Sequence, residues 1–434
     1  MHYLNSLYPN FNDDFEKLLK SRTLDTHSVK KPVSDILQKV QTQGDKALCE
    51  FTEQFDRLSL TPKQLRINQY EIEQAYKDTS LELIAALDLA IERIKNFHQK
   101  QLPSDLTYQD ESGFHLGYRW TPIDSAGLYV PGGTAAYPSS VLMNSIPAKV
   151  AGVKRLAMCV PSPDKTLNPL VLVAADKIGI NEIYRVGGAQ AIAALAFGTE
   201  TIKAVDYIVG PGNAFVAEAK RQVYGVVGID SVAGPSEIVI VTDNKNNPDH
   251  VALDLLAQAE HDRMAQSILL TDDQEFADRV DHSIQRQLQT LTRHNIAQAS
   301  WKEYGTIIIV HSWDKAIDLI NRIAPEHLEL MLDNPEPIFN KVRHAGAIFI
   351  GKWCPEAIGD YIGGPNHVLP TGGTARFSSG LSVFNFMKRS TYLKSDQKGI
   401  REVGPAAVSI ALTEGLTAHA LSISQRLESL NNKD

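Results

Sequence analysis

Apolar residues recur three and four positions apart through much of the first hundred residues, a spacing that places them on one face of a helix. This pattern predicts helices over 15–19, 33–51 and 72–97. The stretch from Leu106 to Trp120 favours a strand instead. Glycines and prolines then gather between Gly127 and Pro138, with Gly132 and Gly133 among them, and indicate a rigid, turn-rich passage rather than a simple linker.

From Arg155 onward, short apolar runs alternate with helical patterns, which predicts parallel βαβ units. The first series of strands and helices is expected at 156–160, 167–177, 182–186, 189–197, 206–209 and 214–223. The second is expected at 237–241, 248–261, 267–270, 273–288, 306–310 and 347–350. Two separate open parallel sheets follow from the two series.

Small residues follow several of the predicted strands, and ligands of open α/β sheets bind at the carboxyl ends of strands. Gly187-Gly188 and the run from Gly210 to Asn213 are therefore candidate nucleotide loops. Phe215 stands where the dinucleotide fingerprint requires a third glycine, so that spacing alone predicts no cofactor. Plain tight turns after strands explain the same residues.

Length and composition narrow the class of protein. A chain of 434 residues is long enough for more than one hydrophobic core. Its 43% hydrophobic and 22% charged residues are typical of folded globular proteins. A net charge of -8 and the absence of a Lys/Arg run argue against nucleic-acid binding. No apolar run is long enough for a membrane helix and Met1 to Asn12 is unlike a signal peptide, so we expect a cytoplasmic protein.

Cysteine usage restricts any metal chemistry. Cys49, Cys159 and Cys354 are few and far apart, which excludes a disulfide framework and a CxxC zinc site. A metal would need nitrogen and oxygen ligands, which directs attention to the 13 histidines and their carboxylate neighbours. Cys354 as a covalent nucleophile is the weaker alternative, because no histidine stands near it in the sequence and free cysteine more often serves in packing.

Gln258 and His261 are the first candidate ligands. They lie three residues apart on the predicted helix 248–261 and so project from one side of it. Glutamine oxygen is an uncommon ligand, better suited to a six-coordinate nitrogen and oxygen sphere than to a closed tetrahedral zinc site. The alternative is an exposed polar face with a surface histidine.

Glu326 and His327 follow Pro325 directly and form a candidate acid–base pair. If Pro325 begins a helix, its dipole favours an ionised Glu326 and a neutral His327. Leu328, Leu330 and Leu332 alternate equally well as a strand would. A capping glutamate beside a structural histidine explains the pair without catalysis.

The stretch from Gly359 to His367, followed by 371–376, has the glycine content of an active-site loop. Glycines permit close backbone approach, so we expect Asp360 and His367 to fold toward one point. A connecting loop of this length is uncommon inside a compact domain. Near the end of the chain, Glu414 should precede a helix that carries His419 and runs to about Leu427. A tail helix of this kind suits either a partner chain or a solvated histidine.

Together these segments resemble the histidinol dehydrogenase family over nearly the whole chain. The matching motifs are Leu128 to Gly133, Val186 to Ala191, Gly210 to Asn213, Ala233 to Glu237, Gln258 to His261, Pro325 to His327, and Asp360 to His367. The resemblance implies two Rossmann-like open parallel-sheet domains of the aldehyde-dehydrogenase-like kind, with small N- and C-terminal helical tail segments. It places metal and catalytic residues in 23–125 with 237–381, NAD binding in 126–236, and tails at 1–22 and 382–434.

The resemblance also implies a set of site residues in a homodimer with shared active sites. A zinc ion would be held by Gln258, His261, Asp360 and, from the other subunit, His419. The zinc ligands would also meet the substrate, together with Ser236, Glu326, His327, His367 and Glu414. NAD would contact Tyr129, Gln190 and Asn213.

The activity implied is the oxidation of L-histidinol through L-histidinaldehyde to L-histidine, with hydride passing to NAD in each of the two steps. His327 suits the base for the hydroxyl proton, and Glu326 suits the group that activates water for the aldehyde. Two rivals remain: a zinc hydrolase in which Glu326 activates water against an amide, and a non-catalytic metal or nucleotide binder.

Overall fold

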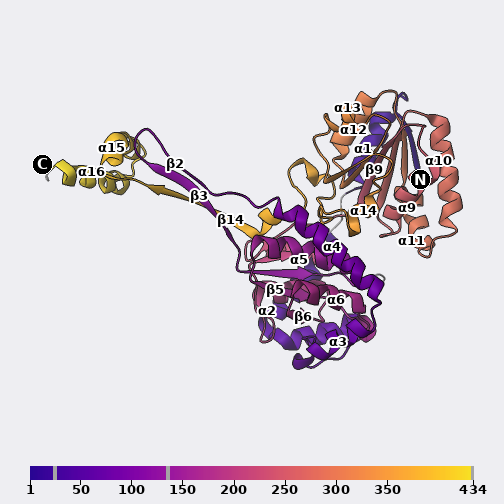
Figure 1. Ribbon diagram of the computed structural model, residues 1–434, viewed down its shortest axis with the longest axis horizontal. Helices are drawn as coiled ribbons and strands as arrows, with labels where there is room; N and C mark the ends of the chain where they lie inside the picture. The colour runs from indigo at the N-terminus through magenta and orange to yellow at the C-terminus, as the bar shows by residue number, and fades with distance from the viewer. Residues whose placement is uncertain (23–26, 133–136, 432–434) are drawn as a thin grey trace. The chain divides into compact units, whose positions relative to one another are not determined.

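The computed structural model describes residues 1–22, 27–132 and 137–431. It divides into two compact units, Met1–Gln101 with Asp124–Phe386, and Leu102–Ile123 with Met387–Asp434 (Figure 1). Gly133 of the predicted turn-rich passage lies outside the described residues. Within the described ranges, no helix combines the length and apolar character that crossing a membrane requires.

A six-stranded sheet with entirely parallel pairing lies in the first unit, in the order β1-β11-β10-β9-β12-β13. Its strands are β1 (His2–Asn5), β9 (Glu237–Thr242), β10 (Gln266–Thr271), β11 (Thr306–Ile309), β12 (His327–Met331) and β13 (Ala347–Ile350). All six residues of β9 are buried, as expected for a parallel strand covered on both faces.

Successive residues of β9 point into opposite halves of the core. Ile238 packs with residues of α9 (Pro248–Ala259), α10 (Gln274–Leu288) and α11 (His294–Tyr304). Val239 packs with residues of α1 (Phe11–Lys20) and α12 (Trp313–Ile323) on the other face. Helices therefore cover both faces, which explains the continuous apolar run of this strand.

A second, five-stranded sheet of the same unit is also entirely parallel, in the order β6-β5-β4-β7-β8. Its strands are β4 (Ser125–Tyr129), β5 (Arg155–Cys159), β6 (Glu182–Tyr184), β7 (Tyr207–Val209) and β8 (Gly228–Ile229). The chain runs outward from β4 to β6 and then crosses to β7 on the other side, so a topological switch point lies between β4 and β7. The prediction of two open parallel sheets is confirmed.

The helices that follow α1 and precede residue 102 belong with the five-stranded sheet. Residues of α2 (His27–Asp56) join the same core as α7 (Gly188–Phe197) and α8 (Ala214–Val223). α3 (Gln69–Lys77) contacts α6 (Pro169–Ile178), and α4 (Leu81–Gln99) contacts α5 (Pro138–Ala151). The family resemblance assigned residues 23–125 and 237–381 to one domain, and those domain limits stay a prediction.

The single helix predicted over 72–97 is wrong, because the chain breaks between α3 and α4. Ser80 begins α4 as its N-cap, with its hydroxyl accepting a hydrogen bond from the Leu83 N–H at 3.3 Å. A serine oxygen at this position satisfies a backbone donor that the helix itself leaves free. Both helices have buried apolar residues of their own, Ile72 and Ala75 on α3 and Leu87, Ala90 and Ile94 on α4, so the helical pattern in the sequence looks continuous across the break.

The second unit contains an antiparallel sheet in the order β14-β3-β2 and two helices. Its strands are β2 (Leu106–Gln109), β3 (His115–Pro122) and β14 (Met387–Lys394). The strand predicted from Leu106 to Trp120 is thus a hairpin. α15 (Gln397–Thr413) and α16 (Thr417–Asn431) pack against each other, and Glu414 precedes α16 as expected.

Candidate active site

Glu326 and His327 lie at the amino end of β12, which begins at His327. No helix begins at Pro325, so of the two alternatives the strand is correct. His327 is in register with Ile238, so the pair lies beside the start of β9. Strand order also reverses between β9 and β12. The site nevertheless lies at the amino ends of these strands, opposite the edge that ligands of open α/β sheets usually occupy.

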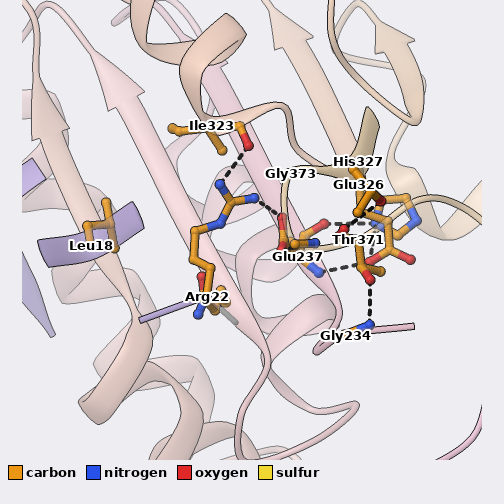
Figure 2. A network of polar contacts seen from close by, with 12 residues as sticks. Leu18, Arg22, Gly234, Glu237, Ile323, Glu326, His327, Thr371 and Gly373 are labelled. Atoms are coloured by element: carbon orange, nitrogen blue, oxygen red, sulfur yellow. Dashed lines mark hydrogen bonds and ion pairs between the residues drawn. The ribbon is translucent and has the colours of Figure 1, made fainter. Parts of the chain in front are cut away.

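The backbone of Glu237 holds both side chains. Its N–H donates to Oε2 of Glu326 at 2.9 Å, and its carbonyl oxygen accepts from Nδ1 of His327 at 2.9 Å (Figure 2). Because a carbonyl oxygen can only accept, the proton sits on Nδ1 and Nε2 carries the lone pair. Nε2 is buried and has no hydrogen-bond partner among the described residues. His327 therefore presents a free basic nitrogen.

Burial sets the protonation of this pair. It lowers the pKa of His327 to about 4, so the imidazole is neutral near pH 7. Burial also raises the pKa of Glu326 well above its ordinary value, and the charges of Glu237, Asp360 and Glu356 add to the shift. The helix dipole that would have favoured an ionised Glu326 is absent, because no helix begins there. A cation bound among these carboxylates would lower their pKa values.

A group of side chains beside the pair can hold a metal ion. His327, Glu356 and Asp360 offer ligand atoms that lie within 4.8 Å of one another. Asp360 belongs to the short helix α14 (Glu356–Tyr361), and its Oδ2 is 3.8 Å from Nε2 of His261. His367 Nδ1 donates to the backbone oxygen of Asp360 at 3.0 Å. The expected approach of Asp360 and His367 is confirmed.

The charge of Asp360 is stabilised by its neighbours. Burial alone would raise its pKa, but the hydrogen bond from His367 and the imidazoles of His367, His327 and His261 outweigh burial and lower the pKa to about 2. Asp360 is therefore the group here that most readily carries a negative charge for a cation.

Gln258 adds an oxygen donor at the last turn of α9. Its side chain is buried, and Oε1 lacks a hydrogen-bond partner within the described part of the chain. Buried amide oxygens are rarely left unpaired, so this atom fits a ligand such as a metal ion. His261 lies two residues beyond the end of the helix, and its N–H donates to the Gln258 carbonyl at 3.2 Å. The donors of Gln258, His261 and Asp360 fit a nitrogen and oxygen metal sphere.

Sequence reasoning missed three acidic residues next to this group. Glu356 lies 3.5 Å from Nε2 of His327 through its Oε1. Glu329 accepts a hydrogen bond from the Glu356 N–H at 2.6 Å and interacts with Asp254. One signal was available: Glu329 interrupts an apolar strand, where a charged residue is seldom found without a specific role.

The other predicted substrate contacts lie in different places. Ser236 is half-buried directly before β9, and its carbonyl accepts from the Gln266 N–H at 2.9 Å. Glu414 is the C-cap of α15 and His419 lies in the first turn of α16, both exposed in the second unit. Their contribution to a site stays a prediction. Cys354, the alternative nucleophile, is half-buried.

The candidate NAD residues lie at the carboxyl ends of the five-stranded sheet. Tyr129 ends β4, and its hydroxyl accepts from the Gly188 N–H at 3.1 Å. Gln190 is buried in the first turn of α7. Asn213 caps α8 by accepting from the N–H groups of Phe215 and Val216 at 3.1 and 3.2 Å. These residues flank the switch point between β4 and β7, where such sheets bind ligands.

Fold and site define an α/β protein with an acid–base pair and metal-capable donors on one parallel sheet, and candidate cofactor loops on another. The profile of the histidinol dehydrogenase family matches residues 19–427. The chain is 58% identical over 428 residues to the histidinol dehydrogenase of Gluconobacter oxydans. The aligned stretch covers 99% of this chain and 100% of that protein. The chain is 54% identical over 429 residues to that of Ruegeria pomeroyi, covering 99% of each.

A solved structure agrees with these relatives. The crystal structure of histidinol dehydrogenase from Elizabethkingia anophelis has a TM-score of 0.94 and 38% sequence identity to this chain, covering 99% of each. The chain belongs to the histidinol dehydrogenase family, and the resemblance drawn from its motifs is confirmed.

Proposed function

We propose that the protein is a zinc-dependent histidinol dehydrogenase that oxidises L-histidinol through L-histidinaldehyde to L-histidine. NAD accepts one hydride in each oxidation. The observation that carries this proposal is a buried, neutral imidazole, His327, with a free Nε2 beside a carboxyl group and metal-capable donors. Relatives that align with this chain over 99% or more of their own length are named histidinol dehydrogenase.

The two residues of the acid–base pair accept protons in different oxidation steps. In the first, Nε2 of His327 takes the hydroxyl proton while the carbinol carbon gives hydride to NAD, which leaves the aldehyde. In the second, Glu326, whose pKa a bound cation would lower so that it is ionised, takes a proton from the water that adds to the aldehyde, and the resulting hydrate anion loses hydride to a second NAD. The product is the acid. Both proton acceptors are held by the backbone of Glu237, so they stay in place through both steps.

The donors near Asp360 suit a zinc ion. Gln258, His261, Asp360 and His419 of the partner subunit would hold it in a homodimer. When bound, zinc would act as a Lewis acid and orient the imidazole and amine of the substrate. Ser236, His367 and Glu414 would complete the substrate contacts, while Tyr129, Gln190 and Asn213 would contact NAD. This enzyme would work in the cytoplasm.

One assay tests the proposal: zinc-loaded protein with L-histidinol and NAD, counting NADH formed per histidinol consumed. Two equivalents of NADH support the two-step oxidation, whereas a single equivalent contradicts it. Turnover of an amide without NAD would support a hydrolase instead. Zinc binding with no product from either kind of substrate would support a non-catalytic binder.

A further inference from the structure

One residue links the two halves of the acid–base pair. Glu237 holds Glu326 through its N–H and His327 through its carbonyl oxygen, each at 2.9 Å. Any shift of the Glu237 backbone would therefore move both proton acceptors together. The contacts that fix the Glu237 backbone therefore also fix the positions of Glu326 and His327.

The carboxylate of Glu237 is held from two sides. Its Oε1 accepts from the Gly372 N–H at 2.7 Å, and its Oε2 accepts from the guanidinium of Arg22. The side chains of Glu237 and Arg22 are only 3% and 4% exposed, so water does not compete for this ion pair. Charge-assisted bonds of this kind are the strong hydrogen bonds of protein interiors.

Arg22 also reaches the segment that leads into β12. Its Nη1 donates to the carbonyl oxygen of Ile323 at 2.6 Å, three residues before Glu326. Figure 2 shows the guanidinium between Ile323 and Glu237, with one bond to each. One planar cation thus joins the start of β9 to the turn before β12, a geometry that the fork of arginine suits and a lysine cannot reproduce.

The cation is itself anchored by the N-terminal segment. Arg22 follows α1, whose Phe15 and Leu18 are buried in the core of the six-stranded sheet. On the other side of Glu237, Thr371 Oγ1 accepts from the Gly234 N–H at 2.5 Å, which holds the loop that supplies Gly372. Two distant segments of the chain, those of Arg22 and Gly372, therefore converge on the Glu237 carboxylate.

From this geometry we infer that Arg22 and Glu237 are positioning residues, which fix the backbone that orients Glu326 and His327 for proton transfer. The inference rests on the proposed function for its kinetic readout and on the hydrogen bonds alone for its structural one. Neither residue touches the substrate in this role. Their effect is on kcat, since misplacing catalytic groups by about an ångström can cost roughly 100-fold in rate.

Two variants separate positioning from mere stability. Arg22→Met removes the bridge and leaves Glu237 buried without its cation. Arg22→Met with Glu237→Gln removes the unpaired charge as well, while the glutamine oxygen can still accept from Gly372. We expect the double variant to regain melting temperature and yet remain about tenfold or more below the parent in kcat. Arg155→Met is the matched control, because it breaks the Arg155–Glu182 ion pair of the five-stranded sheet.

The experiment combines steady-state kinetics of the zinc-loaded full chain with NMR of protein labelled at histidine with ¹⁵N. The kinetics use histidinol and NAD, and the NMR follows the Nδ1 proton of His327, identified by its loss in His327→Asn. We expect kcat to fall in Arg22→Met while the Kd for histidinol stays within about threefold, Arg22→Lys to recover part of kcat, and the Nδ1 proton signal to shift or broaden.

Recovery of kcat along with melting temperature in the double variant would overturn the inference, as would an unchanged Nδ1 signal in both variants. A kcat loss in Arg155→Met equal to that in Arg22→Met would also overturn it. If the parent protein makes no NADH from histidinol, the proposed function fails, and the NMR signal still decides the positioning role without any turnover. Should Arg22→Met not fold, the double variant and Arg22→Lys carry the same comparison.

Discussion

His327 donates its Nδ1 proton to the carbonyl oxygen of Glu237 at 2.9 Å and turns Nε2 toward Glu356, 3.5 Å away. Because burial lowers the pKa of His327 to about 4, its imidazole keeps a lone pair on Nε2 throughout the neutral pH range. A base held in this tautomer by a backbone atom needs no partner carboxylate to select the nitrogen that accepts a proton.

His327→Asn should slow the oxidation of histidinol far more than the oxidation of supplied histidinaldehyde. Asparagine is shorter than histidine and has no basic nitrogen, so the first step loses its proton acceptor, at a cost of about 10²–10⁴-fold. Rapid-mixing kinetics with each substrate in turn measure the two steps separately. His282→Asn, at an exposed site on α10, is the control and should leave both rates unchanged. Equal losses in the two steps would contradict the division of labour.

Glu326→Gln should impair mainly the second oxidation. The glutamine oxygen can still accept from the Glu237 N–H, but the side chain can no longer take a proton from water. We expect the yield of NADH per histidinol to fall from two toward one, with aldehyde trapped by semicarbazide in the assay. A yield that stays at two with a uniformly slower rate would show that another group activates the water.

Glu329→Gln should make the protein more stable at pH 8 than its parent. Burial raises the pKa of Asp254 to about 6 and that of Glu329 well above its ordinary value. An acid with a raised folded pKa stabilises the fold below its unfolded pKa, near 4, and this stability is lost as pH rises through the folded pKa. Glutamine has no proton to lose, so we expect a gain of about 1–3 kcal/mol at pH 8 and little at pH 4.

Urea denaturation of the metal-free protein at the two pH values measures this difference. Glu73→Gln, an exposed residue of α3, provides the control and should follow the pH dependence of the parent. If Glu329→Gln and the parent lose stability in parallel between pH 4 and pH 8, the buried carboxyl pair is not the source of the pH dependence.

Regular elements with a clear pattern could be predicted from the sequence. The predicted bounds of α8 and β13 are the observed ones, because α8 has the helical spacing of apolar residues and β13 is a short apolar run typical of a strand. β4 was missed since Ser125, Ala126 and Gly127 lack the bulk of a typical strand. Gly127 is small because a Cβ there would lie 3.0 Å from Leu195 and Val205. α5 was missed because nearly all its residues are buried, which removes the helical period.

The candidate site was predictable only where its residues fall in local motifs. The pairs Gln258 with His261 and Asp360 with His367 lie close in the chain, so their spacing was enough to predict that each pair comes together. Arg22 and Glu237 lie 215 residues apart, and no local pattern relates them. The protonation of Glu326 could not be predicted for the same reason, because its pKa is raised first by burial and then by carboxylates that the fold brings from distant segments.

Mixing Glu326→Gln chains with His419→Asn chains tests whether the active site is shared between subunits. If His419 serves the partner's site, a hybrid dimer has one site with both defects and one with neither. Random pairing of equal amounts should then restore about a quarter of the parent's rate of L-histidine formation from histidinol, since half the dimers are hybrids and half their sites are intact. The matched control mixes Glu326→Gln with Asp360→Asn chains, whose defects fall in the same chain's site, and should restore no L-histidine formation. No recovery in the first mixture, with subunit exchange verified by mass, would place His419 in the site of its own chain.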